Sequence, residues 1–350
     1  MTEQRKTGRM EELDEFNALT CLLVILIHVL SLGVTMLERG AWQLAPVYFL
    51  WKLSGFVVPA FLFSGAVKLG RALAEGQVPP YGVYIWRRIR KIYLPYLAAS
   101  LLYVAVYRVI GVTETLSLRD LLCDLLLGRV SSQFYYIVLV MQFYLLLPLW
   151  KCFLTRVSPC VALPLGILVS FFMLRSDYFL RDTAFAPYYF RDRIFLSYLF
   201  FWLWGLYSGA HYDMLRRRLQ PMSRLSIALA CGAVLGFVCI TYVQLVTDVY
   251  VYDGNDMKLF SDALSILLLL YGCIRLRGLS CPRLHGTLRR IYGASYSVFL
   301  SHCLFLTVGT IYLQRFGVVR MVALLPLRAA ICYTLPFALH ALLRRFRTAR

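Results

Sequence analysis

The chain has 350 residues, of which 60% are hydrophobic and 16% are charged, and it carries a formal net charge of +19. Soluble globular chains contain about 45–50% apolar and about 25% charged residues, so this composition excludes a soluble enzyme and a disordered chain. A soluble protein this basic would suggest nucleic acid as a partner. In a chain this apolar, the charge indicates a membrane protein with basic cytoplasmic loops, and we expect no nucleic acid partner.

Ten apolar segments follow one another along the chain, separated by short polar loops. A transmembrane helix needs about 20 mostly apolar residues. The segments therefore predict an all-α, polytopic integral membrane protein with about ten transmembrane helices in one domain, 16–343. A further apolar stretch, 116–129, is interrupted by Asp120 and Asp124, and we interpret it as an interfacial helix. The ten segments are 16–36, 46–67, 92–111, 134–155, 158–174, 194–211, 225–246, 259–275, 292–313 and 321–343.

The basic residues favour one orientation in the membrane. With the N-terminus placed inside, 24 of the 37 Lys and Arg residues fall in the N-terminal segment, the even-numbered loops and the C-terminal tail. Because positively charged loops stay in the cytoplasm, we predict that both termini are cytoplasmic. The chain then has a cytoplasmic segment at 1–15 and a basic tail at 344–350. We expect a multi-pass protein of the cytoplasmic (inner) membrane.

Two histidines lie within apolar segments. His28 belongs to a polar stripe that recurs at helical spacing along the first segment. Ionisable groups inside a bilayer are expensive and face the bundle interior, where a neutral imidazole can take a proton from a sugar hydroxyl. The structural alternative is a histidine that only hydrogen-bonds neighbouring helices. Both interpretations also apply to His302. The stripe consists of Asn17, Cys21, Val24, His28, Ser31 and Thr35.

A basic run precedes the third apolar segment, and its members are Arg87, Arg88, Arg90 and Lys91. The tendency of basic loops to stay on the cytoplasmic side of the membrane explains most of such a run. The functional alternative is a phosphate site for a cytoplasmic donor, because arginine forks bind phosphate through two parallel hydrogen bonds.

Other polar residues within the apolar segments leave several alternatives open. Lys52 interrupts the second segment, where it either lines a cavity or lies beside an ordinary kink. Arg328 and Asp262 either pair across the bundle or lie near the membrane interface. Most of the ten cysteines lie in apolar runs without a CxxC pair, which favours small apolar side chains over metal ligands, and we expect no metal site.

Four motifs, in this order and over about 11–343, resemble the acyltransferase-3 family of integral membrane O-acyltransferases. That family has about ten spans and modifies cell-surface carbohydrates. It usually has arginine eleven residues before the first-helix histidine. Here that position is Asn17, which hydrogen-bonds but supplies no fixed charge. The motifs are Glu12-Leu13-Asp14-Glu15-Phe16-Asn17-Ala18 followed by His28, Phe61-Leu62-Phe63-Ser64-Gly65, Arg88-Ile89-Arg90-Lys91-Ile92-Tyr93-Leu94-Pro95-Tyr96, and Tyr296-Ser297-Val298-Phe299-Leu300-Ser301-His302.

The resemblance implies an enzyme that moves an acetyl or succinyl group from a cytoplasmic acyl-CoA to a hydroxyl of a cell-surface or exported carbohydrate. Acyl-CoA would be the donor substrate, with no tightly bound cofactor. The protein would lie in the lipid bilayer and bind the carbohydrate acceptor. A further partner that the resemblance allows is the polysaccharide synthase machinery. The residues expected to act are His28, Asn17 and His302 in catalysis, Arg87, Arg88, Arg90 and Lys91 in donor binding, and Ser64, Tyr136 and Gln142 in substrate binding.

The stretch 134–144 is most similar to the biofilm polysaccharide branch of the family, named intercellular adhesion protein C. That branch has been regarded as an exporter of poly-N-acetylglucosamine and, alternatively, as its O-succinyltransferase. The alternative function is therefore a polysaccharide or lipid-linked sugar exporter without acyl transfer. Aromatic residues such as Tyr135, Tyr136 and Trp150 that can stack on sugars support it. The lack of an internal repeat counts against it.

Overall fold

A computed structural model describes residues 10–112, 117–176, 191–249 and 257–348 of the chain. These residues form helices and connecting segments, with no β-strand among them, which confirms the all-α prediction. The α-helices are α1 (Glu11–Met36), α2 (Leu44–Leu53), α3 (Val57–Ala74), α4 (Tyr81–Arg88), α5 (Leu94–Val109), α6 (Leu118–Leu127), α7 (Tyr135–Leu145), α8 (Leu147–Arg156), α9 (Pro159–Leu174), α11 (Leu199–Ala210), α12 (Tyr212–Leu219), α13 (Arg224–Thr247), α14 (Lys258–Arg277), α15 (Pro282–Arg315) and α16 (Met321–Thr348). Shorter turns are η1 (Ile89–Tyr93), η2 (Arg191–Arg193) and η3 (Phe195–Tyr198).

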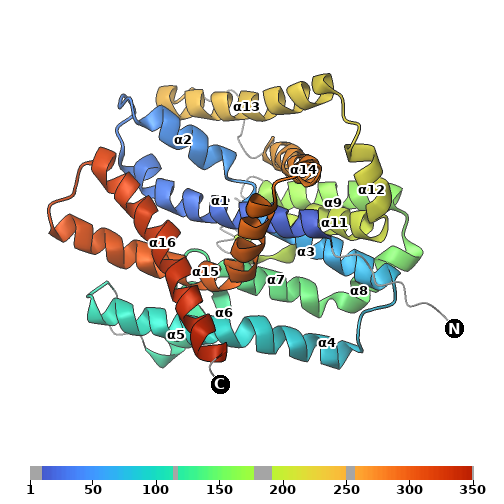
Figure 1. Ribbon diagram of the computed structural model, residues 1–350, viewed down its shortest axis with the longest axis horizontal. Helices are drawn as coiled ribbons and strands as arrows, with labels where there is room; N and C mark the ends of the chain where they lie inside the picture. Colours follow the sequence, from blue (N-terminus) through green and yellow to red (C-terminus); the bar gives the residue numbers. More distant parts are fainter. Residues whose placement is uncertain (1–9, 113–116, 177–190, 250–256, 349–350) are drawn as a thin grey trace.

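Helix α1 lies at the centre of the bundle, where it contacts α2, α3, α14, α15 and α16 (Figure 1). Its first turn carries Glu11, Glu12 and Asp14, whose negative charges are stabilised by the positive end of the helix dipole. The apolar run that follows packs on several sides, with Phe16 and Ile25 fully enclosed. The stripe with Asn17 and His28 therefore has neighbouring helices to face.

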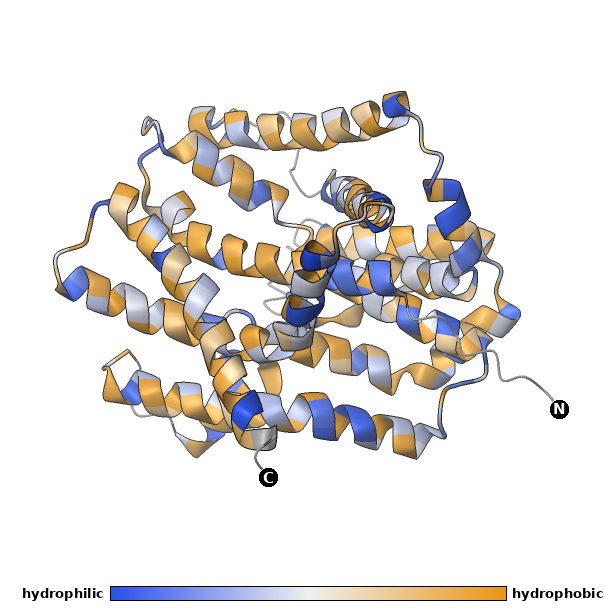
Figure 2. Ribbon diagram, viewed as in Figure 1, coloured by the Kyte–Doolittle hydropathy of each residue, from blue (hydrophilic) through white to orange (hydrophobic). Residues whose placement is uncertain are grey.

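Among the described residues, seven helical stretches are long and apolar enough to cross a membrane, when α2–α3 (Leu44–Ala74) and α4–α5 (Tyr81–Val109) each count as one stretch. The bent pair α7–α8 makes an eighth if it counts as one span. Of the other predicted spans, α9 has 16 residues and α11 has 12, so both are short for a crossing. Hydrophobic residues cover most helices, whereas hydrophilic ones gather on α4 and α12 (Figure 2). The polytopic architecture is thus supported, while the number ten and the side on which the termini lie stay predictions.

Two predicted spans are interrupted along their length. The second is divided into α2 and α3 around Gly55, and α7 meets α8 at an angle of 55° just before Pro148. Proline lacks a backbone N–H and cannot continue the ladder of helical hydrogen bonds. Interrupted backbone at membrane depth is tolerated where it is buried in protein or lines a cavity. Gly55, at the first break, lines a cavity between α1, α2, α3 and α7.

Helices α3 and α11 pack closely because glycines face the partner backbone. A Cβ at Gly70 would lie 2.0 Å from the carbonyl oxygen of Leu206, and a Cβ at Gly209 would lie 2.0 Å from that of Val67. Small residues that let two backbones approach are the usual means of helix packing in membranes. This contact fixes α3, which carries Ser64 and Lys68, in its place.

We expect Gly209→Ala to destabilise the protein by about 1–3 kcal/mol, because the added methyl group forces the α3 backbone away. Gly236→Ala in α13 is the matched control, since a Cβ there meets no atom within 4 Å. The Gly236→Ala variant should be as stable as the wild type or more stable, because alanine has a higher helix propensity than glycine. Thermal unfolding of the detergent-purified variants measures both effects. Equal melting temperatures for the two variants would contradict this account of the α3–α11 contact.

Candidate active site

The first of three adjoining cavities lies beside α4, with a volume of ≈ 350 Å³. We call it the basic cavity. The guanidinium of Arg88 lies over the rings of Tyr84 and Tyr144, 4.9 and 4.6 Å from their centroids, which holds its fork in place. Arg90 is exposed and does not line the cavity, because it projects from another side of the helix. The structure thus brings together three of the four predicted donor residues. The polar lining consists of Lys68, Gln77, Tyr84, Arg87, Arg88, Lys91 and Tyr144.

The second, middle cavity has a volume of ≈ 220 Å³ and shares Lys68, Gly65 and Tyr144 with the basic cavity. Asn17 and Ser64 lie on its wall, and the Ser64 hydroxyl donates a hydrogen bond of 2.6 Å to Asn17 Oδ1. The structure therefore joins two residues that the sequence analysis placed in different roles.

Lys68 supplies the positive charge of the middle cavity. Its ammonium lies 3.3 Å from Asp14 Oδ1 and 2.9 Å from the hydroxyl of Tyr292. Asn17 lies on the same wall and carries no charge. Sequence reasoning missed Lys68 because it counted the residue only toward membrane orientation. The signal was its position one helical turn after Ser64, on the same face.

The third cavity, the histidine cavity, has a volume of ≈ 310 Å³ and shares Phe61, Tyr136 and Phe299 with the middle cavity. The rings of His28 and His302 face each other with their centroids 5.2 Å apart. Sequence reasoning predicted both residues, and the structure brings them together from opposite ends of the chain. The polar and aromatic lining includes His28, Ser31, Trp51, Gln133, Tyr135, Tyr136, Tyr198 and Lys258.

Local hydrogen bonds select the tautomer of His302. Its Nδ1 lies 3.0 Å from the carbonyl oxygens of both Val298 and Phe299, so this nitrogen carries the proton as a donor. Its Nε2 is then an acceptor, and the Cys303 thiol lies 3.3 Å from it. His302 is fully buried, whereas His28 lines the cavity. His28 is therefore the histidine that a substrate can reach.

The pair of histidines also forms part of a possible ligand set. His28, His302 and Cys303 each offer one ligand atom, and these atoms lie within 4.8 Å of one another. Nitrogen and sulfur are ligands that zinc accepts. However, the buried guanidinium of Arg328 donates to the His28 carbonyl oxygen at 3.3 Å and to the Thr310 hydroxyl at 2.7 Å. A divalent cation beside this positive charge would be repelled, which disfavours a metal ion here.

Each charged residue within the apolar segments has contacts of its own in the structure. Asp262 accepts a hydrogen bond of 2.5 Å from Lys258, one turn earlier in α14. The ammonium of Lys52 lies 5.1 Å from the centroid of the Phe237 ring. The pairing of Arg328 with Asp262 is not among the contacts of the described residues, because Arg328 turns toward α1 and α15 instead.

The predicted substrate-binding residues have different surroundings. Tyr136 lies between two cavities and lines both, and Ser64 lines the middle one. Gln142, in contrast, donates to the carbonyl oxygen of Arg193 at 2.6 Å and accepts from the backbone N–H of Phe195 at 3.2 Å. Its amide thus links α7 to the segment before α11, and it does not line any of the three cavities.

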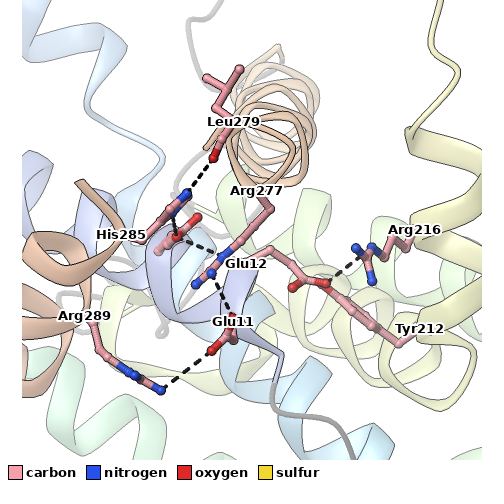
Figure 3. A network of polar contacts seen from close by, with 9 residues as sticks. Glu11, Glu12, Tyr212, Arg216, Arg277, Leu279, His285 and Arg289 are labelled. Carbon is pink, nitrogen blue, oxygen red and sulfur yellow. Dashed lines mark hydrogen bonds and ion pairs between the residues drawn. The ribbon is translucent and has the colours of Figure 1, made fainter. Parts of the chain in front are cut away.

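An acidic cluster at the start of α1 ties that helix to its neighbours (Figure 3). Glu15 is 1% exposed, and its Oε1 lies 2.6 Å from His285 Nδ1 and 2.9 Å from Arg277 Nε. A buried carboxylate needs such partners, since an unpaired one is costly. No local sequence pattern indicates this contact, because His285 lies 270 residues from Glu15 along the chain. The other ion pairs join Glu11 to Arg277 and Arg289, and Glu12 to Arg216.

Helix α12 joins the same cluster through Tyr212, whose hydroxyl donates to Glu12 Oε1 at 3.2 Å (Figure 3). Burial raises the pKa of Tyr212 above its ordinary value, and the Glu12 carboxylate raises that pKa further. The hydroxyl therefore stays protonated and remains a donor. Because Asp14 of the same turn binds Lys68, this part of α1 also positions the charged side chain that lines the middle cavity.

Comparisons with known proteins agree with the motifs and the fold. A family model described as "Acyltransferase domain" matches residues 11–342. The "Putative membrane-bound acyltransferase YfiQ" of Bacillus subtilis (strain 168) is 22% identical over 351 aligned positions, which cover 97% of this chain and 92% of the relative. The "Probable poly-beta-1,6-N-acetyl-D-glucosamine export protein" of Staphylococcus aureus (strain MRSA252) is 24% identical over 246 positions, 65% of each chain. No solved structure matches the chain.

Proposed function

The chain belongs to the acyltransferase-3 family of membrane acyltransferases, and from this premise we propose that it transfers an acyl group from a cytoplasmic acyl-CoA to a hydroxyl of a carbohydrate. One observation carries the proposal. The basic cavity, the middle cavity and the histidine cavity adjoin in that order, with Lys68 common to the first two and Tyr136 common to the last two. Phosphate-binding groups and a candidate base thus lie at the two ends of one path.

The donor would enter from the basic cavity. Arg87, Arg88 and Lys91 bind its phosphates, since guanidinium forks match phosphate oxygens. The pantetheine arm then runs through the middle cavity toward His28. Asn17 and His28 are separated by about 17 Å along α1, at 1.5 Å per residue. This stretch of α1 runs from the middle cavity to His28, and it is the part of the path that the pantetheine arm would have to cover.

His28 would act as the general base. It takes the proton of the acceptor hydroxyl while that oxygen attacks the carbonyl carbon of the thioester. The carbon–sulfur bond then breaks, and the CoA thiolate leaves and takes up a proton. His302, with its Nδ1–H fixed by two carbonyl oxygens, keeps Nε2 available to relay that proton. Asn17 lies too far from His28 for this step, and we place it with Ser64 along the donor arm.

The acceptor would bind on the far side of the histidine cavity. Trp51, Tyr135 and Tyr198 give this cavity aromatic walls with a few polar groups, a composition typical of small-molecule sites. Export of an unmodified polysaccharide is the second candidate function, and the printed name of the Staphylococcus aureus relative favours it. In both cases the ligand is a carbohydrate, and only the transfer step distinguishes them.

The distinguishing experiment supplies the purified protein with acetyl-CoA or succinyl-CoA and an oligosaccharide. We expect free CoA thiol that depends on the oligosaccharide, together with a matching mass increase of the sugar. Omitting the oligosaccharide gives the background of thioester hydrolysis. Movement of unmodified sugar into proteoliposomes without thiol release would refute the transferase and support export.

A further inference from the structure

A fourth cavity lies between α5, α15 and α16, and it adjoins the basic cavity at Lys91. Its volume is ≈ 570 Å³, and we call it the α5–α15–α16 groove. The hydroxyls of Ser297 and Ser301 interrupt a lining that is otherwise mostly apolar. The apolar lining includes Leu102, Leu300, Leu304, Phe305, Leu339 and Leu343.

The groove is basic toward one end. Lys91 of η1 and His340 and Arg344 of α16 line it, and no carboxylate does so among the described residues. Lys91 follows α4 and Arg344 lies near the end of α16, in segments that the charge distribution predicts to be cytoplasmic. The groove therefore combines an apolar length with a cationic group of residues at the predicted membrane surface.

The groove has exposed apolar side chains on two of its helices. Leu102 of α5 is 55% exposed and Leu343 of α16 is 46% exposed. In a membrane protein, such side chains contact hydrocarbon tails instead of water. A molecule from the lipid phase can therefore enter sideways without crossing a polar barrier.

We propose that this groove binds an anionic phospholipid, with its phosphate at Lys91, His340 and Arg344 and an acyl chain along the apolar walls. Basic pockets between transmembrane helices on the cytoplasmic side bind anionic lipid head groups. Charge complementarity selects an anionic lipid over a zwitterionic one. Because Lys91 lines both this groove and the basic cavity, the lipid phosphate and the donor phosphates are neighbours.

Two variants and one matched control test the site. Gly293→Leu places a side chain in the groove, and a Cβ at this position meets no atom within 4 Å. Gly286→Leu makes the same change on the same helix, also in open space but outside the groove. Arg344→Gln removes one cationic group. Native mass spectrometry of protein purified from membranes with phosphatidylglycerol and phosphatidylethanolamine measures the bound lipid.

We expect phosphatidylglycerol on the wild-type protein and on Gly286→Leu. Its occupancy should fall about fivefold for Arg344→Gln, the effect of one cation near an anionic head group, and further for Gly293→Leu. Retained phosphatidylethanolamine, a lipid-linked saccharide in its place, or equal phosphatidylglycerol occupancy on all variants would overturn the proposal. Thermal unfolding is a second readout on the wild type: the melting temperature should rise with added phosphatidylglycerol and not with phosphatidylcholine. Both readouts measure lipid binding alone, so they are independent of whether acyl transfer is observed.

Discussion

Replacing His28 with alanine is expected to lower acyl transfer by roughly 10²–10⁴-fold, the usual contribution of a general base. His28 lines the histidine cavity, and no hydrogen bond to its ring is found among the described residues. Alanine therefore leaves no polar partner unsatisfied, and the protein should remain in the membrane at its normal amount. His28→Gln keeps a polar side chain of similar size that cannot take the proton, so it should lose as much activity as alanine.

The measurement is the rate of CoA release with an oligosaccharide acceptor, at saturating donor and over a range of donor concentrations. A lost base lowers kcat and leaves the KM for the donor nearly unchanged, because the phosphates bind at the other end of the path. His211→Ala is the control, since this histidine is exposed at the end of α11 and lines none of the three cavities. Wild-type acylation by His28→Ala would sink the mechanism.

The chemistry-bearing residues were easier to predict from the sequence than their grouping. His28 and His302 stand out because each interrupts an apolar run, whereas their proximity, with ring centroids 5.2 Å apart, became visible only in the structure. Asn17, however, shares the stripe of His28 and still serves another cavity, because eleven residues along a helix separate two groups by about 17 Å. Residues on one face of a helix point in the same direction. Their spacing along the chain then sets how far apart they lie along the helix axis.

Long-range pairs could not be predicted from local patterns. Lys68 was explained by membrane orientation and His285 lies far from α1 in sequence, yet each binds an acid near the start of α1. Those acids were visible, but the choice of partner depends on how α3 and α15 pack. Helix length was a third limit, since the predicted span 194–211 is α-helical only from Leu199 to Ala210 and begins with the 3-10 turn η3. The fold class was therefore predictable, and the exact set of spans was not.

Replacing Arg88 with glutamine is expected to raise the KM for acyl-CoA by about 10–100-fold and to change kcat little. A hydrogen bond to a charged group contributes about 1.5–3 kcal/mol, and this guanidinium lines the cavity to which we assign the donor phosphates. Arg88→Lys should recover only part of the affinity. Lysine keeps the charge, but it has no planar fork to stack between Tyr84 and Tyr144 while it binds two oxygens.

Arg90→Gln is the matched control. It removes the same charge two residues further along the chain, from a side chain that does not line the cavity. An exposed charge contributes about 1 kcal/mol or less, so the KM should change less than about fivefold. Donor saturation curves at two salt concentrations then separate a local contact from the general field of the basic surface, because salt screens the field of exposed charges more strongly than a contact in a cavity. If Arg88→Gln and Arg90→Gln raise the KM equally, and salt erases both effects, the basic residues only concentrate the anionic donor near the membrane. If Arg88→Gln alone raises the KM, and salt leaves the difference in place, the phosphates bind in the basic cavity and the path to His28 begins there.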